Sequence, residues 1–153
     1  MKKISLLTLL LASAALIITG CSKDKNNNPV SGKNIKYTIT VTGATDIDYV
    51  SFIFSGGTTN PNDKTIWKID GVAQENEAAV SLTEDDFGAG KTIVVESTKG
   101  LYMAHARAQC LQPSNDSRTY KISYKAEVNG KVVRDDANVS VGYNSDYTHM
   151  FDY

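Results

Sequence analysis

The segment from residue 120 to residue 141 constrains the fold more than any other, because it reads as two paired strands. Its first half alternates apolar and polar side chains with period two, the repeat of a half-buried β-strand. The apolar positions are Tyr120, Ile122, Tyr124, Ala126 and Val128. Asn129-Gly130 follows, and this dipeptide is the preferred sequence of a type I′ hairpin turn. The return strand runs from Lys131 to Val141, and a phase shift at Arg134-Asp135-Asp136 predicts a β-bulge.

The same alternation recurs through most of the chain after residue 34. It predicts strands over residues 35–42, 49–54, 64–70, 78–82, 92–97 and 147–151. Residues 101–111 fit either a strand or a helix, since alanine favours the helix; because the neighbouring segments are strands, we interpret them as a strand. Thr83, followed by three acidic residues and Gly88, predicts one capped helical turn between two strands.

Seven to nine short strands, separated by turn-forming residues every 8–12 positions, are typical of an antiparallel β-sandwich. The sequence therefore predicts an all-β fold, with an immunoglobulin-like sandwich as the first choice and a small β-barrel as the alternative. We expect one domain over residues 35–153, which is long enough to bury a core of its own.

The first twenty residues have a different character. Lys2 and Lys3 precede a run from Ile4 to Ile18 that only small hydroxyl residues interrupt. This run has fifteen residues, whereas a membrane-spanning helix needs about 20, so it reads as the apolar core of a signal peptide. It ends in Ile18-Thr19-Gly20-Cys21.

This ending resembles the lipobox of bacterial lipoproteins. The resemblance implies that residues 1–20 are removed and that Cys21 carries a diacylglyceryl group and, in most such proteins, a further acyl chain on its new amino terminus. Two or three chains anchor a protein stably to a bilayer. Residues 21–34 are then the lipidated cysteine and a polar tether, expected to stay flexible because it holds little apolar surface.

The residues after Cys21 bear on location. Ser22 is not the aspartate that retains lipoproteins at the inner membrane of enteric bacteria. The polar run containing Asp24 resembles the export signal of small surface lipoproteins of the Bacteroidota, some of which carry immunoglobulin-like domains. We therefore expect the outer membrane with exposure at the cell surface; the alternative is a domain that faces the periplasm.

The net charge limits which classes of partner are expected, and the cysteine content limits which covalent bonds can stabilise the fold. Removal of Lys2 and Lys3 leaves 14 basic and 17 acidic residues, a net charge of −3 without a basic stripe, so nucleic acid is not expected as a partner. With Cys21 lipidated, Cys110 has no second cysteine to pair with. We expect it to be a small buried apolar residue, and the fold to be stabilised by packing without a disulfide.

We find no pattern of catalytic residues. Gly90-Lys91-Thr92 lacks the first glycine of a phosphate-binding loop and precedes a strand; His105 and His149 have no zinc-like spacing. No cofactor and no metal site are therefore expected. Acidic turns such as Asp46-Ile47-Asp48 offer oxygen ligands that calcium prefers, but none fits an EF-hand, and acidic residues are common in turns.

The aromatic residues outside the expected core faces remain. Trp67, together with the Ser55–Asp63 loop, and the pair Tyr143 and Tyr147 are the candidate ligand-binding residues, because exposed aromatic rings stack on sugars or anchor protein partners. Packing at sheet edges is the structural alternative for each ring. The leading hypothesis is a non-catalytic module that binds a glycan or a protein. The second is an accessory subunit of an envelope complex, and the third is an enzyme.

Overall fold

The computed structural model describes residues 32–153 as strands connected by turns, with one short helix. The predicted signal peptide, Cys21 and the tether up to residue 31 lie outside the described residues. Within the described part, no helix combines the length and the apolar character that crossing a bilayer requires. The elements are β1 (Ile35–Thr42), β2 (Tyr49–Gly57), β3 (Trp67–Ile69), β4 (Val72–Ala73), β5 (Ala79–Thr83), α1 (Glu84–Phe87), β6 (Thr92–Ser97), β7 (Met103–Leu111), β8 (Tyr120–Val128), β9 (Lys131–Val141) and β10 (Tyr147–Asp152).

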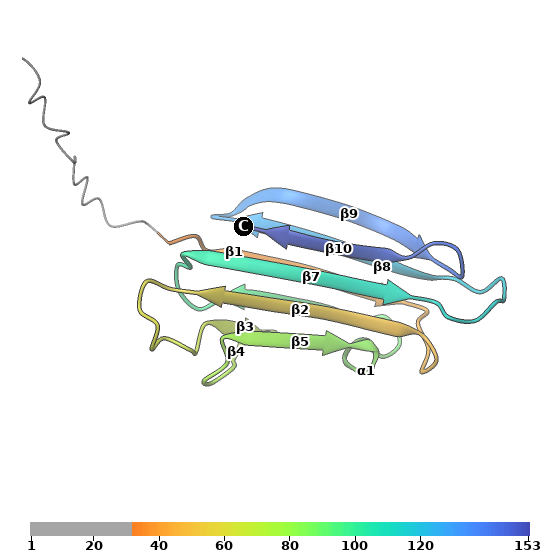
Figure 1. Ribbon diagram of the computed structural model, residues 1–153, viewed down its shortest axis with the longest axis horizontal. Coiled ribbons are helices and arrows are strands. Elements are labelled where there is room, and N and C mark those ends of the chain that lie inside the picture. Colours follow the sequence, from red (N-terminus) through yellow and green to blue (C-terminus); the bar gives the residue numbers. More distant parts are fainter. Residues whose placement is uncertain (1–31) are drawn as a thin grey trace, which may run out of the picture.

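The strands form two antiparallel sheets packed face to face (Figure 1). One sheet has six strands in the order β4-β3-β6-β1-β8-β9, and the other has four in the order β10-β7-β2-β5. The sheets do not close on each other, so the predicted sandwich is confirmed and the barrel alternative is wrong.

Two central strand pairs are arranged as in an immunoglobulin-like sandwich, but the complete strand order of the sheets differs from that fold. In that fold one sheet carries strands A-B-E-D and the other C-F-G, so strand B pairs with E and C with F. The pairs β1–β6 and β2–β7 stand in this relation, in opposite sheets. The place beside β1 differs: β8, from the second half of the chain, fills it.

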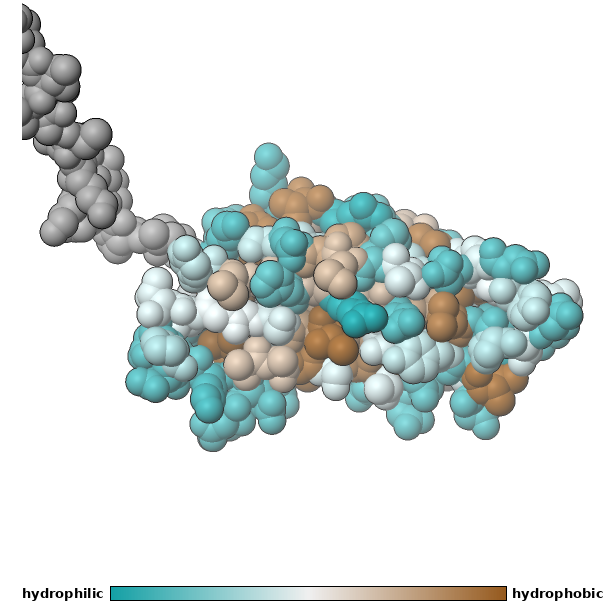
Figure 2. Space-filling model, viewed as in Figure 1, coloured by the Kyte–Doolittle hydropathy of each residue, from teal (hydrophilic) through white to brown (hydrophobic). Residues whose placement is uncertain are grey.

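The core lies between the sheets and is built from the alternation read in the sequence. Along β1, Ile35, Tyr37, Ile39 and Val41 are buried while the intervening residues face solvent or are half-buried. Tyr37 stacks on Phe54 of the opposite sheet with ring centroids 4.5 Å apart. Figure 2 shows the outer face of the four-stranded sheet, where hydrophobic residues form separate patches among hydrophilic ones.

Local predictions are mostly confirmed. Residues 103–111 form strand β7, not a helix. Thr83 caps α1, and its hydroxyl and backbone amide both bond Asp86. Asn129 and Gly130 have φ angles of 51° and 77°, and a type I′ turn requires positive values at both positions. The pairing of β8 with β9 shifts register on either side of Arg134-Asp135-Asp136, as the predicted bulge requires.

One strand is corrected. The predicted strand over residues 64–70 is reduced to β3, Trp67–Ile69. Lys64 and Thr65 belong to the loop that leads into it, where the Ile66 amide bonds the Lys64 carbonyl at 2.9 Å. Asp70 and Gly71 both have positive φ and turn the chain into the two-residue strand β4, which the alternation does not reveal because two residues show no period.

Candidate functional site

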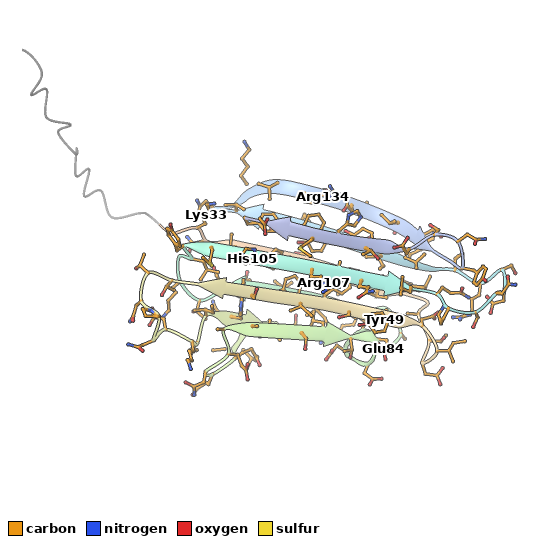
Figure 3. The ribbon with its side chains drawn as sticks, in the orientation of Figure 1. Lys33, Tyr49, Glu84, His105, Arg107 and Arg134 are labelled. Carbon is orange, nitrogen blue, oxygen red and sulfur yellow. The ribbon has the colours of Figure 1, made fainter. Side chains whose placement is uncertain are left out.

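Three long loops gather at one end of the sandwich, which we call the loop end. They connect β1 to β2 (residues 43–48), β7 to β8 (112–119) and β9 to β10 (142–146). The register places them together, because Val50 and Tyr147 both pair with Cys110 near the end of β7. In Figure 3, Tyr49 and Glu84 lie towards the loop end and Lys33 lies at the opposite end.

A buried ion pair joins two of these loops. The carboxylate of Asp48 is inaccessible to solvent, and Arg118 donates to both of its oxygens, at 2.6 and 3.1 Å. Thr45 adds its backbone amide at 2.8 Å and its hydroxyl at 3.0 Å. Burial alone would raise the pKa of the Asp48 carboxyl, but these bonds outweigh it and hold the pKa below its ordinary value.

Asp116 organises the second loop from within. One of its oxygens accepts the side-chain amide of Gln112 at 2.7 Å and the backbone amide of Arg118 at 2.9 Å. Asp116 thereby fixes the part of the loop that carries Arg118, whose side chain bonds Asp48. The carboxylates of Asp48 and Asp116 thus both have structural partners.

A shallow depression of about 270 Å³ lies between the second and third loops. Its walls are the segments 116–119 and 140–145, which meet where Gly142 approaches Thr119 so closely that a Cβ on the glycine would stand 3.1 Å from the Thr119 methyl. Most of the residues that line the depression have polar side chains. The lining consists of Asp116, Ser117, Arg118, Thr119, Ser140, Gly142, Tyr143, Asn144 and Ser145.

Tyr143 supplies the aromatic ring of this depression. It is 49% exposed and sits in a tight turn that Gly142 and Ser145 close through reciprocal backbone hydrogen bonds of 2.8 and 2.9 Å. The Ser145 hydroxyl also donates to the Ser140 carbonyl at 3.2 Å. An exposed ring beside hydroxyl, amide and guanidinium groups is a combination that recognises polar ligands with apolar faces.

The other two aromatic candidates lie in the core. Trp67 is fully buried, and its indole nitrogen donates to the Ala78 carbonyl at 3.1 Å. Tyr147 is 2% exposed, and its hydroxyl donates to Asp136 at 2.8 Å. The expectation that these rings are exposed is therefore wrong. Trp67 also belongs to the end opposite the depression, because it pairs with Ser97, whose hydroxyl bonds the first residue of β1.

The predicted Ser55–Asp63 loop begins later than expected, because residues 55–57 continue strand β2, and it does not join the depression either. It lies at the end of the sandwich that also holds Lys33 (Figure 3). Within the loop, the Thr58 hydroxyl donates to the Asn60 carbonyl at 2.9 Å and to Asp63 at 3.2 Å. Lys99, from the connection between β6 and β7, pairs with Asp63 at 3.3 Å.

The two histidines are also accounted for. On the outer face of the four-stranded sheet, His105 Nδ1 lies 2.5 Å from Asp152, and Ser55 faces His105 across the neighbouring strand. This row has the residue types of a serine hydrolase triad, but among the hydrogen bonds of the described residues none joins Ser55 to His105. His149 packs between the rings of Tyr147 and Phe151, at 4.5 and 5.4 Å.

A second depression, of about 380 Å³, opens near residues 34–36. Glu96, Ser97 and Glu127 contribute to its wall, and Lys36 pairs with Glu96 there at 3.3 Å. Its lining contains no aromatic ring. Across residues 32–153 we also find no group of three histidine, cysteine, aspartate or glutamate side chains placed to hold a metal ion.

Comparisons with solved structures give matches to the fold. A DUF4425 family protein from Bacteroides ovatus aligns with a TM-score of 0.56, over 80% of this chain and 95% of its own, at 15% sequence identity. A domain of unknown function, DUF4425, from Bacteroides vulgatus aligns equally well, with 15% identity and coverages of 80% and 94%. The calcium-bound form of a protein from Parabacteroides distasonis aligns with a TM-score of 0.56 and 12% identity, over 79% of this chain and 93% of its own.

At these identities the likeness concerns the fold alone. No protein-family profile matches the chain, and no curated protein matches it significantly. The neighbours bring no catalytic family to this chain, since the two DUF4425 proteins are themselves described as a family or domain without an assigned function.

Proposed function

We propose that this protein is a lipid-anchored, non-catalytic binding module that presents its loop end to a glycan. The observation that carries the proposal is the opposite placement of two features. The described chain begins at Gly32 and Lys33, and the polar depression with Tyr143 lies at the far end of the sandwich. A lipid on Cys21 would therefore direct the depression away from the bilayer.

The anchor rests on Ile18-Thr19-Gly20-Cys21 and the lysine-led apolar run before it. Both precede the described residues. Eleven residue steps separate Cys21 from Gly32, which at full extension span about 40 Å, so the folded part stays close to the lipid. The origin of the structural neighbours in Bacteroides and Parabacteroides is compatible with an outer-membrane lipoprotein displayed at the cell surface.

A glycan fits the depression better than an apolar ligand does. Sugar rings offer hydroxyl groups for hydrogen bonding and a C–H face for stacking, and the lining provides hydroxyls, an amide, the Arg118 guanidinium and the Tyr143 ring. The depression is open and shallow, so it could accept either an internal segment or one end of an oligosaccharide. Shallow sites with few anchors bind weakly, so we expect dissociation constants near the micromolar to millimolar range.

The test uses the mature protein and an array of defined neutral and acidic oligosaccharides, with affinities of the hits measured by calorimetry. Tyr143→Ala should weaken binding about tenfold, the loss of one stacking contact. Tyr102→Ala is the matched control, because Tyr102 is similarly exposed, at 55%, but lies at the opposite end, where its amide donates to the Gly57 carbonyl at 2.7 Å. Equal affinities for the two variants would remove the loop end from consideration.

Location is tested separately, by protease digestion of intact and lysed cells. Digestion of the domain on intact cells supports surface display. Protection until lysis would place it in the periplasm and favour the second hypothesis, an accessory subunit of an envelope complex, which co-purification after mild crosslinking would then identify.

Calcium is a second candidate ligand because one structural neighbour is a calcium-bound form. The three loops carry exposed Asp46, Asp116 and Asp146, which are not grouped around one point in this structure, whereas Asp48 is already bonded by Arg118 and Thr45. A calcium ion would have to draw the loops together. If calcium binds here, millimolar calcium should raise the unfolding temperature, and Asp46→Asn should reduce that rise. An unchanged unfolding temperature would exclude calcium as a ligand of this chain.

A further inference from the structure

Exposed apolar side chains flank the point where the described chain begins. Tyr102 is 55% exposed, and Val132 and Val133 are each 47% exposed. Backbone bonds of 2.8 and 2.9 Å between Lys33 and Leu101 hold Tyr102 on one side of this point. On the other side, the Asn34 amide donates to the Asn129 side chain and the Asn129 amide to the Asn34 carbonyl, both at 2.8 Å, which pins the β8–β9 hairpin there.

The two valines owe their exposure to a β-bulge. Successive residues of a regular strand point to opposite faces, so one of two neighbouring valines would normally be buried. Here Val132 pairs with Glu127 and Arg134 with Ala126, which leaves Val133 as the extra residue. The bulge turns both side chains outward at the tip of a long hairpin. This exposure gives no benefit to the folded core, and large apolar side chains gathered at one surface mark a contact site.

Two lysines accompany these side chains. Lys33 lies two residues before β1 and Lys131 follows the hairpin turn, and both are exposed. Neither lies within salt-bridge distance of a carboxylate of the described residues, unlike Lys36, which is paired with Glu96. Ammonium groups beside tyrosine and valine match the interface of a bilayer, where lipid phosphates accept hydrogen bonds and the aromatic ring sits at headgroup level.

From these features we infer that the surface formed by Tyr102, Val132, Val133, Lys33 and Lys131 rests on the bilayer that carries the protein's own lipid. The inference rests on the proposed anchoring at Cys21. That anchor keeps the surface within about 40 Å of the membrane, so a contact too weak to recruit a free protein is still populated. The sandwich then stands with its loop end outward, in one orientation.

The experiment places one fluorophore at either end of the lipidated protein in vesicles of phosphatidylethanolamine and phosphatidylglycerol. Val133→Cys labels the proposed contact, and Ile47→Cys, 53% exposed in the β1–β2 loop, is its matched control. The native Cys110 is buried and does not compete for the label. We expect a blue shift on vesicle binding and quenching by brominated lipids at position 133, and neither effect at position 47.

A second measurement separates the contact from the anchor. Flotation of the lipidated protein with vesicles reports anchoring alone. If the protein floats but the labels at positions 133 and 47 respond alike, the proposed contact surface is contradicted, whereas the proposed anchor is supported. If the protein does not float, both proposals fall. Tyr102→Ser combined with Val132→Ser should lower the quenching at position 133 at least about threefold while flotation stays unchanged.

Discussion

The guanidinium of Arg118 donates to both oxygens of the Asp48 carboxylate, across 70 residues of sequence, and so joins the β1–β2 loop to the β7–β8 loop. Asp48 has no solvent-accessible side-chain surface, whereas Arg118 keeps 29% of its own. The pair therefore forms a buried contact beneath the surface of the loop end, and Arg118 also belongs to the lining of the depression.

Removal of one partner should destabilise the fold strongly. Arg118→Ala leaves the Asp48 carboxylate buried with only Thr45 to bond it, and we expect a loss of about 2–4 kcal/mol in the free energy of unfolding. Glu96→Gln is the control: the Lys36–Glu96 pair has both side chains substantially exposed and should contribute at most about 1 kcal/mol. Urea unfolding of both variants measures the difference, and similar losses would contradict a buried role for Asp48.

Acid should destabilise the protein by protonating two carboxylates that the fold holds ionised, those of Asp48 and Asp136. Burial would raise the pKa of Asp48 and of Asp136, but hydrogen bonds from Arg118 and Thr45, and from Arg134 and Tyr147, lower both below the ordinary value. The unfolded chain therefore takes up protons first as the pH falls. The stabilisation is complete above the unfolded pKa near 4 and is lost as the pH drops from there through the lower folded pKa values.

The measurement is urea unfolding at pH 7, 4, 3 and 2. The free energy of unfolding should fall steeply below pH 4, and Asp48→Asn should show a shallower fall because its side chain does not titrate. A variant whose stability depends on pH as steeply as that of the unchanged protein would show that other carboxylates control acid unfolding.

The strands could be predicted from the sequence because their cause is local. The spans of β1, β6, β8 and β9 follow from alternation that a window of six to eleven residues contains. Trp67 shows the limit. Ile66 and Trp67 are consecutive, and both are fully buried. This is possible because β3 begins only at Trp67, so Ile66 still belongs to the loop. An alternating pattern places neighbouring side chains on opposite faces of a strand, so the pattern could not predict that both are buried.

The candidate site was less predictable for a related reason. Tyr143 was recognisable as an aromatic residue in polar sequence, but Arg118 and Asp48 show no pattern that connects them. Their contact depends on β7 pairing with β2, which brings the loops before Tyr49 and after Leu111 to one end. Sequence composition carries no information about that pairing, so the ion pair emerges only from the topology.

Trp67 should act on stability and not on binding. Trp67→Ala removes a fully buried indole and its hydrogen bond to Ala78, so we expect a loss of about 3–5 kcal/mol. Tyr143→Ala, on the surface, should change stability by at most about 0.5 kcal/mol. Chemical unfolding of the two variants checks this, and a small effect at Trp67 would mean that its ring leaves the core readily.

Cys110 should be chemically silent in the folded protein. It is fully buried, and burial raises the pKa of its thiol to about 12 despite a hydrogen bond from Ser51, so almost no thiolate is present at pH 8. A thiol reagent should react with it only after unfolding in urea, whereas the introduced cysteine of Val133→Cys should react at once. Rapid labelling of Cys110 without denaturant would show that β7 separates from its neighbours.

A final prediction compares two buried tyrosine hydroxyls. The hydroxyl of Tyr37 has no hydrogen-bond partner among the described residues, whereas that of Tyr120 donates to the carbonyls of Tyr49 and Leu111, at 3.1 and 3.2 Å. An unpaired buried hydroxyl costs free energy, so Tyr37→Phe should stabilise the fold by about 1 kcal/mol, and Tyr120→Phe should destabilise it by about 1–2 kcal/mol.

Both changes remove one oxygen and leave the ring, so urea unfolding of the two variants isolates the hydrogen bonds from packing. Opposite signs are expected. Equal losses would mean that the Tyr37 hydroxyl is satisfied within the core, by a water molecule bound there or by a shift of the neighbouring Tyr153, whose ring centroid lies 5.6 Å away.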